Sequence, residues 1–244
     1  MNADRVALVT GAARRIGATI ATRLHKEHWR VLVHCRLSGD SARSLVAGFN
    51  AERPGSAAVL EADLLDPLAV TGLATQALGV FGRLDLLVNN ASSFFPSPLG
   101  QIDQATWDEL MGTNLKVPLF LTQACLPYLR DSGGAVVNLT DVHAARPLGQ
   151  HAVYEAAKAG LLMLTRSLAR DLAPAVRVNA VAPGNILWSE DHPYDPAVKA
   201  ALLQRVPMGR LGTADEVAAA VCYLAGSSYI TGQVLTVDGG YLLT

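Results

Sequence analysis

The feature that most constrains the fold is a regular alternation of short apolar runs with longer segments of helical period. The apolar runs cover residues 6–10, 31–35, 57–61, 84–89, 135–140, 176–181 and 234–237, and the helical segments include residues 16–27, 67–78, 107–130, 151–172 and 214–224. Apolar strands separated by helices are typical of a parallel sheet covered on both faces. The pattern predicts an α/β fold, with residues 1–244 forming a single doubly wound domain around a mainly parallel seven-stranded sheet.

Composition excludes several classes of protein. Half of the 244 residues are hydrophobic, 17% are charged and the formal net charge is −1, which argues against disorder and against a nucleic-acid partner. No apolar stretch reaches the roughly 20 residues of a membrane span, and no signal segment opens the chain. Cys35, Cys125 and Cys222 have no metal-ligand spacing, so we expect buried thiols and no metal site. The sequence predicts a cytoplasmic protein without a membrane partner.

A glycine-containing loop joins the first apolar run to the first helix. Residues 10–17 read Thr-Gly-Ala-Ala-Arg-Arg-Ile-Gly, with glycines at Gly11 and Gly17 and arginines at Arg14 and Arg15. Glycine permits a tight turn, and a helix N-terminus offers free N–H groups to a pyrophosphate. In the first unit of a Rossmann-like pattern this predicts dinucleotide binding. The alternative, a plain turn with glycine caps, leaves the paired arginines unexplained.

The end of the second apolar run selects the cofactor. Residues 34–38 contain no acid that would bind a ribose 2′-hydroxyl, whereas Arg36 and Ser38, with Arg14 or Arg15, could bind a 2′-phosphate. NADPH is therefore the predicted cofactor, against the alternative that Arg36 is a solvated loop charge. Asp63, after the third run, either accepts a hydrogen bond from the adenine amino group or lies at a helix N-terminus.

Three residues form a candidate proton-delivery device. Tyr154 and Lys158 are four residues apart and share a helix face, and Asp141 ends an apolar run at the mouth of the sheet. A lysine cation lowers the pKa of a nearby tyrosine, which is about 10 when unperturbed. A carboxylate at the sheet edge can supply protons to that tyrosine. The trio predicts an enzyme.

Together these motifs resemble the short-chain dehydrogenase/reductase family over essentially the whole chain. The resemblance includes residues 10–17, Asn89-Asn90-Ala91, Asn114, Tyr154-xxx-Lys158, Pro183-Gly184 and Asp238-Gly239-Gly240. It implies that Tyr154 donates the proton, that Lys158 holds the nicotinamide ribose and lowers the tyrosine pKa, and that Asn114 anchors a water. The expected cofactor-binding residues are Gly11, Arg14, Arg15, Ile16, Gly17, His34, Arg36, Ser38, Asp63, Leu64, Asn90, Ala91, Lys158, Pro183 and Gly184.

Two departures from the general family pattern favour a subgroup. Arg15 replaces the middle glycine of the loop, and Asp141 replaces a serine thirteen residues before the tyrosine. A carboxylate would repel the oxyanion that develops on a carbonyl substrate, whereas it suits protonation of a ring nitrogen. Both departures, and the segments at residues 90–99 and 237–241, are similar to those of pteridine reductases. That resemblance implies NADPH-dependent reduction of a pterin.

The resemblance also implies a substrate site and an assembly. A pterin would stack between Phe94 and the nicotinamide, with Ser92 and Arg15 at its polar edge and Leu148 and Trp188 lining the remainder. The implied assembly is a homotetramer, with residues 241–244 near an interface. An alternative activity is reduction of a carbonyl such as a 3-oxoacyl thioester, and a third possibility is a non-catalytic NADP-binding protein. His143 and His151 are interpreted as loop or capping residues.

Overall fold

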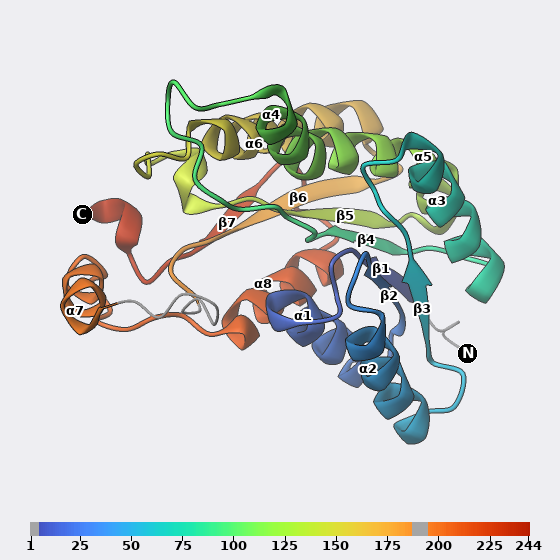
Figure 1. The fold of residues 1–244 in the computed structure, drawn as a ribbon. Helices are drawn as coiled ribbons and strands as arrows, with labels where there is room; N and C mark the ends of the chain where they lie inside the picture. Colours follow the sequence, from blue (N-terminus) through green and yellow to red (C-terminus); the bar gives the residue numbers. More distant parts are fainter. Residues whose placement is uncertain (1–4, 187–194) are drawn as a thin grey trace.

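The computed structural model describes residues 5–186 and 195–244 and contains one seven-stranded parallel sheet (Figure 1). The strands follow the order β3-β2-β1-β4-β5-β6-β7 across the sheet. Their bounds are β1 Val6–Val9, β2 Arg30–Cys35, β3 Ala57–Glu61, β4 Leu86–Asn89, β5 Ala135–Leu139, β6 Arg177–Pro183 and β7 Val234–Val237. The predicted parallel sheet is confirmed, and each apolar run overlaps one strand.

Helices cover both faces of the sheet in two layers (Figure 1). One layer contains α1 (Arg15–Lys26), α2 (Gly39–Glu52) and α8 (Ala214–Gly226), and the other contains α3 (Pro67–Phe81), α5 (Val117–Ser132) and α6 (Ala152–Leu172). Two shorter helices are α4 (Gln104–Met111) and α7 (Pro196–Gln204), and single 3-10 turns are η2 (Val142–Ala144) and η3 (Tyr241–Leu243). No helix within the described residues is both long and apolar enough to cross a membrane.

Strand β1 shows why the runs are apolar without interruption. Ala7 and Val9 pack against the α1, α2 and α8 layer, whereas Val6 and Leu8 pack against the α3, α5 and α6 layer, and all four are fully buried. Successive side chains of a strand point to opposite faces, so a strand covered on both sides needs apolar residues at every position.

The predicted helical segment over residues 107–130 is confirmed, but it is not α-helical throughout. A π-helical segment, η1 (Gly112–Lys116), separates α4 from α5. A π segment adds one residue to a helical turn and hardly alters the apolar period, so periodicity does not reveal it. Such segments often occur at functional sites. Here it carries Asn114, a fully buried residue. Helices α2 and α7 were not predicted.

The chain order places a crevice at one end of the sheet. The chain builds β1, β2 and β3 outward on one side, then crosses back so that β4 pairs with β1. Ligands of doubly wound sheets bind outside the carboxyl ends of the strands at this reversal. The loops after β1 and β4 therefore form the centre of any ligand site.

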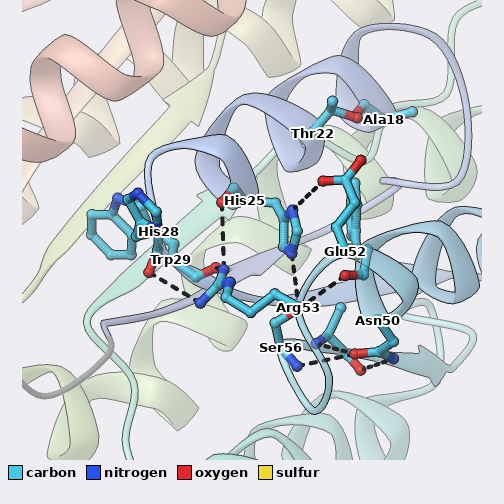
Figure 2. Close-up of polar contacts among 11 residues, drawn as sticks. Ala18, Thr22, His25, His28, Trp29, Asn50, Glu52, Arg53 and Ser56 are labelled. Carbon is cyan, nitrogen blue, oxygen red and sulfur yellow. Dashed lines mark hydrogen bonds and ion pairs between the residues drawn. The ribbon is translucent and has the colours of Figure 1, made fainter.

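A network of polar side chains joins α1 to α2 at the end of their layer that lies opposite the crevice (Figure 2). There His25 of α1 lies between Glu52 and Ser56, with its Nε2 atom 2.8 Å from Ser56 Oγ and its ring stacked on Phe49. Arg53 donates a hydrogen bond to the carbonyl of Trp29. Ser56 is buried, so its hydroxyl is not accessible as a nucleophile. The serine, histidine and glutamate instead hold the end of α1 against the end of α2 and the loop that follows it.

Candidate active site

A cleft of about 610 Å³ lies at the predicted crevice. Its lining includes most of the residues expected to bind the cofactor: Gly11, Arg14, Arg15, Ile16, Gly17, His34, Arg36, Ser38, Asp63, Leu64, Asn90 and Ala91, together with Ser92. Ala13, Cys35, Leu37, Ala62, Leu65, Ser93 and Thr113 complete the lining and were not predicted. Most of them are next to a predicted residue in the sequence. Extending each motif by one residue would therefore have identified them.

The two glycines of the first loop are required by close packing. Gly11 has a φ of +62°, in the left-handed region. A Cβ atom on Gly17 would overlap the carbonyl oxygen of Gly11 and lie 2.6 Å from Asn90 Nδ2 and 2.9 Å from Ala12 Cα. Asn90 in turn donates hydrogen bonds to the carbonyls of Thr10 and Gly11, at 2.8 and 3.1 Å. The loops after β1 and β4 are therefore locked together.

Arg15 occupies a left-handed backbone conformation, with a φ of +52°. It stands where the general family pattern has glycine, and a residue with a Cβ atom costs roughly 1–2 kcal/mol in this conformation. Its side chain is exposed at the cleft. Retention of a strained non-glycine residue is consistent with a use for its guanidinium group.

The N-terminus of α1 is open toward the cleft. Its N-cap residue, Arg14, makes no side-chain capping hydrogen bond, and the first turn contains no acidic residue. The unpaired N–H groups of a helix N-terminus and its partial positive charge suit a pyrophosphate. The residues present thus fit the phosphates of a dinucleotide.

His34 holds the glycine-containing loop in place through a hydrogen bond to Gly11. Its Nδ1 atom accepts a hydrogen bond from the Gly11 N–H at 3.2 Å, and its Nε2 atom lies 3.1 Å from the carbonyl oxygen of Ala62. Burial lowers the pKa of His34 from 6.5 to about 4, against the Ala62 hydrogen bond and the Asp63 charge, which raise it. The imidazole is therefore neutral at pH 7, with Nε2 as its donor.

A second hollow, of about 490 Å³, adjoins the cleft at the end of β2. Arg14, Arg36, Ser38 and Arg43 line it, together with the acids Asp40 and Glu61. Arg14 Nη2 donates to Ser38 Oγ at 2.6 Å, and Arg43 pairs with both Asp40 and Glu61.

Two predictions at this end of the cleft can be compared with the structure. Arg36 lies 3.9 Å from Asp63 and 3.7 Å from Glu109, so it is not simply a solvated charge. Asp63 accepts a hydrogen bond from the Leu65 N–H, and Asp66 is the N-cap of α3. Arg43 was missed because α2, which carries it, was not predicted.

The structure brings Asp141, Tyr154 and Lys158 together. The Tyr154 hydroxyl donates a 2.7 Å hydrogen bond to Asp141 Oδ2. The other carboxylate oxygen, Oδ1, accepts the His143 N–H at 2.8 Å and so caps the η2 turn. Lys158 is buried and donates to the Leu139 carbonyl at 2.9 Å. Both residues lie on α6, and Lys158 Nζ is 5.6 Å from the centre of the Tyr154 ring, which confirms their shared helix face.

The expected lowering of the tyrosine pKa is wrong for this arrangement. Burial raises the pKa of Tyr154 well above its ordinary value of 10, and the charge of Asp141 and its hydrogen bond raise it further. Burial also lowers the pKa of Lys158 from 10.5 to about 8, against the charge of Asp141. A carboxylate beside a phenol opposes the phenolate, so Tyr154 is held in its protonated form.

Asn114 joins the π segment to the loop after β4. Its side-chain amide donates to the carbonyls of Ser93 and Leu110, at 2.8 and 2.9 Å, and its Oδ1 atom accepts the Ser92 hydroxyl at 2.7 Å. The predicted substrate residue Ser92 is therefore fixed by the predicted catalytic residue Asn114.

Phe94 lies beside Tyr154, but one of its faces is already in contact with a histidine. The Phe94 ring stacks on His151 with centroids 4.7 Å apart and planes at 11°, and it meets the Tyr154 ring edge to face at 4.8 Å. His151 is also the N-cap of α6 and lies 2.7 Å from the Gly149 carbonyl. Its capping position was expected, whereas its stacking on Phe94 was missed. Phe94 remains 54% exposed.

Other predicted residues lie apart from the cleft lining. Pro183 ends β6, and the Gly184 N–H bonds to the Val237 carbonyl of β7. Leu148 is held through its N–H by the Glu155 carboxylate. Trp188 lies outside the described residues. Cys35, Cys125 and Cys222 are free and buried, as expected.

Comparison with known proteins gives the family. A family model described as enoyl-(acyl carrier protein) reductase matches residues 11–242. The putative ketoacyl reductase 2 of the granaticin polyketide synthase of Streptomyces violaceoruber is 39% identical, over 96% of this chain and 95% of that protein. Pteridine reductase 1 of Leishmania tarentolae is 36% identical over 98% and 96%, and the 3-oxoacyl-(acyl-carrier-protein) reductase of Staphylococcus aureus is 36% identical over 98% and 99%. The chain belongs to the short-chain dehydrogenase/reductase family of oxidoreductases.

Proposed function

We propose that this protein is an NADPH-dependent pteridine reductase. The observation that carries the proposal is the 2.7 Å hydrogen bond from the Tyr154 hydroxyl to Asp141 Oδ2. Tyr154 is the proposed proton donor, and a carboxylate in contact with that donor determines which substrate atom the donor can serve.

The choice between a carbonyl and a ring nitrogen follows from charge. A carbonyl that accepts a hydride becomes an oxyanion, and hydrogen-bond donors stabilise such an anion. Asp141 offers only acceptor oxygens when ionised and adds a second negative charge nearby. A ring nitrogen is more basic than a carbonyl oxygen and can take its proton before the hydride arrives, so less negative charge develops on the substrate beside Asp141. Asp141 therefore favours reduction of a C=N bond.

The residues of the cleft fit NADPH. The open N-terminus of α1 suits the pyrophosphate, and Arg14, Arg36, Ser38 and Arg43 surround the hollow proposed for the 2′-phosphate. When bound, NADPH supplies the hydride. Lys158 is predominantly charged below pH 8, the pKa given above, so at pH 7 its ammonium can donate hydrogen bonds to a ribose hydroxyl.

Proton delivery is assigned to the chain's own groups. Tyr154 donates its hydroxyl proton to the substrate nitrogen, and its raised pKa means that the proton is regained readily afterwards. Asp141 and Lys158 are the proposed sources of the replacement proton. The Lys158 ammonium already carries one, whereas the Asp141 carboxylate first takes one from solvent and passes it on through its contact with Tyr154. The half-exposed Phe94 ring offers a flat apolar surface on which a pterin can stack, a contact of about 0.5–1.5 kcal/mol beyond area burial.

Reduction of a carbonyl substrate is the second candidate, and the relatives favour it. Ketoacyl and 3-oxoacyl reductases are as similar to this chain as the pteridine reductase is, and the matching family model carries an acyl-carrier-protein name. The relatives thus support a carbonyl more strongly than a pterin, whereas the Asp141 contact supports a pterin.

Substitution Asp141→Ser tests the proposal. The serine hydroxyl can still approach Tyr154 but supplies neither a carboxylate nor its proton. We expect turnover of dihydropterins to fall about 100-fold or more, the usual size of a general acid–base contribution. NADPH affinity, followed by cofactor fluorescence, should hardly change. Unchanged pterin turnover would remove Asp141 from the mechanism.

A further inference from the structure

The segment at residues 238–244, here called the hook, has no part in the function proposed above. It contains the Asp-Gly-Gly motif that the sequence shares with the family. The hook follows β7 and turns back toward the loop between β5 and α6, at the same end of the molecule (Figure 1). That loop carries Asp141.

The sequence of the hook produces a sharp turn in the direction of the chain. Asp238 accepts hydrogen bonds from the N–H groups of Gly240 and Leu242, one on each carboxylate oxygen and each 2.9 Å long. Gly239 and Gly240 both have positive φ values, of 62° and 88°, which favour glycine. A Cβ atom on Gly239 would lie 2.8 Å from Val206, and one on Gly240 would lie 3.0 Å from Pro207. The motif therefore delivers Tyr241 to a fixed place.

Tyr241 is held from several sides. The Arg146 guanidinium carbon lies 4.5 Å above the centre of its ring, and Arg146 Nη1 donates a 2.6 Å hydrogen bond to the Tyr241 carbonyl. The ring also meets that of His143 edge to face at 6.0 Å and packs with Val142 and Val206. It is only 6% exposed.

These contacts end on the turn that orients Asp141. The His143 N–H holds Asp141 Oδ1 at 2.8 Å, and the His143 ring lies 2.9 Å from the Arg146 carbonyl through Nδ1. With Oδ1 held in this way, Oδ2 is left to face Tyr154. Tyr241 packs directly against Val142, His143 and Arg146, and so against the residues that follow Asp141 in the chain.

We infer that the hook is a positioning element for Asp141, in which Tyr241 clamps the η2 turn and so holds the carboxylate toward Tyr154. The inference rests on the proposed function, because it assigns Tyr241 an effect on turnover through the Asp141 contact. Tyr241 does not touch the reacting atoms. A misplacement of about 1 Å in a reacting group can cost about 100-fold in rate.

The test measures kcat and KM for dihydrobiopterin, NADPH affinity and thermal stability in the full-length protein. Tyr241→Ala removes the ring, and Tyr241→Phe keeps it. Arg146→Lys keeps the charge but loses the planar stacking group. Tyr229→Ala is the matched control, because Tyr229 is fully exposed. We expect Tyr241→Ala to lower kcat about tenfold or more, Arg146→Lys to lower it less, and Tyr241→Phe and Tyr229→Ala to leave it within about twofold.

A double-mutant comparison separates positioning from a general structural role. If Tyr241 acts through Asp141, then Tyr241→Ala should cause no further loss of kcat in an Asp141→Ser background. An equal loss in both backgrounds would overturn the inference, as would an equal loss in Tyr241→Phe. If Tyr241→Ala fails to fold, the same comparison of kcat in the two backgrounds is made with Arg146→Lys.

Failure of the hook inference and failure of the proposed function give different results. If Asp141→Ser keeps pterin turnover, the function proposed for Asp141 is wrong. If Asp141→Ser loses turnover while Tyr241→Ala and Arg146→Lys do not, only the hook inference is wrong.

Discussion

The two oxygens of the Asp141 carboxylate have different partners. Oδ1 accepts a backbone N–H and Oδ2 accepts the Tyr154 hydroxyl. Burial and the nearby negative charge raise the tyrosine pKa, which keeps the phenol protonated. At the scale of single residues, this contact is what distinguishes the site from one with a serine in the same place.

His34 predicts a dependence of stability on acid. Its folded pKa of about 4 lies below the ordinary 6.5, so the unfolded chain binds a proton first as the pH falls. Stability from this group is complete above pH 6.5, declines below it and is fully lost near pH 4, by about 3 kcal/mol in total. A protonated ring would also turn Nδ1, the acceptor for Gly11, into a donor.

The substitution His34→Asn keeps a side-chain acceptor near the Gly11 N–H but does not titrate. Urea unfolding between pH 4 and pH 7 should show a smaller acid loss in the variant than in the wild type. The buried His25, whose pKa is also lowered by burial, is present in both proteins and cancels from the difference. Parallel stability curves would contradict the assignment.

At the scale of elements, the strands and most helices were predictable because the residue pattern that specifies each of them lies within the element itself. A strand buried on both faces needs an apolar residue at each position, and the runs show this directly. Helix α2 was missed because its buried face contains only Ala42, Val46 and Phe49, on an otherwise largely polar segment. The π segment that carries Asn114 was missed because a one-residue insertion leaves the period almost intact.

Two helical glycines give a matched test of the loop packing. Gly17→Ala places a methyl group against backbone atoms of Gly11 and Ala12, which cannot move aside, so NADPH affinity should fall at least about tenfold. Gly48→Ala, in the exposed part of α2, meets no atom within 4 Å and should stabilise the protein by about 0.5–1 kcal/mol.

The readouts are cofactor fluorescence titration and thermal unfolding of both variants. Retained affinity in Gly17→Ala would show that the loops after β1 and β4 can separate without loss of the cofactor. In that case the contact of Asn90 with Thr10 and Gly11 would not shape the site.

At the scale of the whole molecule, the sequence identified most of the residues that line the cleft but not how the loops meet across it. Motifs specify which strand ends carry polar groups, and the sheet order then brings them together. The stacking of His151 on Phe94, the place of Arg43 and the packing of Tyr241 beneath the Asp141 turn depend on contacts between distant segments. No short spacing in the sequence encodes such contacts.

We propose that the protein assembles as a homotetramer. Trp107, Phe120 and Met163, on α4, α5 and α6, are 45%, 46% and 60% exposed, and apolar side chains of this size are suited to subunit contacts. Light scattering should give four chain masses for the wild type and a lower mass for Phe120→Glu. The matched change at the fully exposed Tyr229, to Glu, should leave the mass unchanged, and a monomeric wild type would refute the proposal.

The most direct measurement is the rate of NADPH oxidation with biopterin, dihydrobiopterin, dihydrofolate and a 3-oxoacyl thioester, repeated with NADH. We expect turnover of one or more pterins with NADPH, little with NADH, and none of the thioester. The cofactor preference would follow from the arginines at the end of β2, and the substrate preference from Asp141. Turnover of the thioester without any pterin would contradict the proposed function and assign the protein to carbonyl reduction.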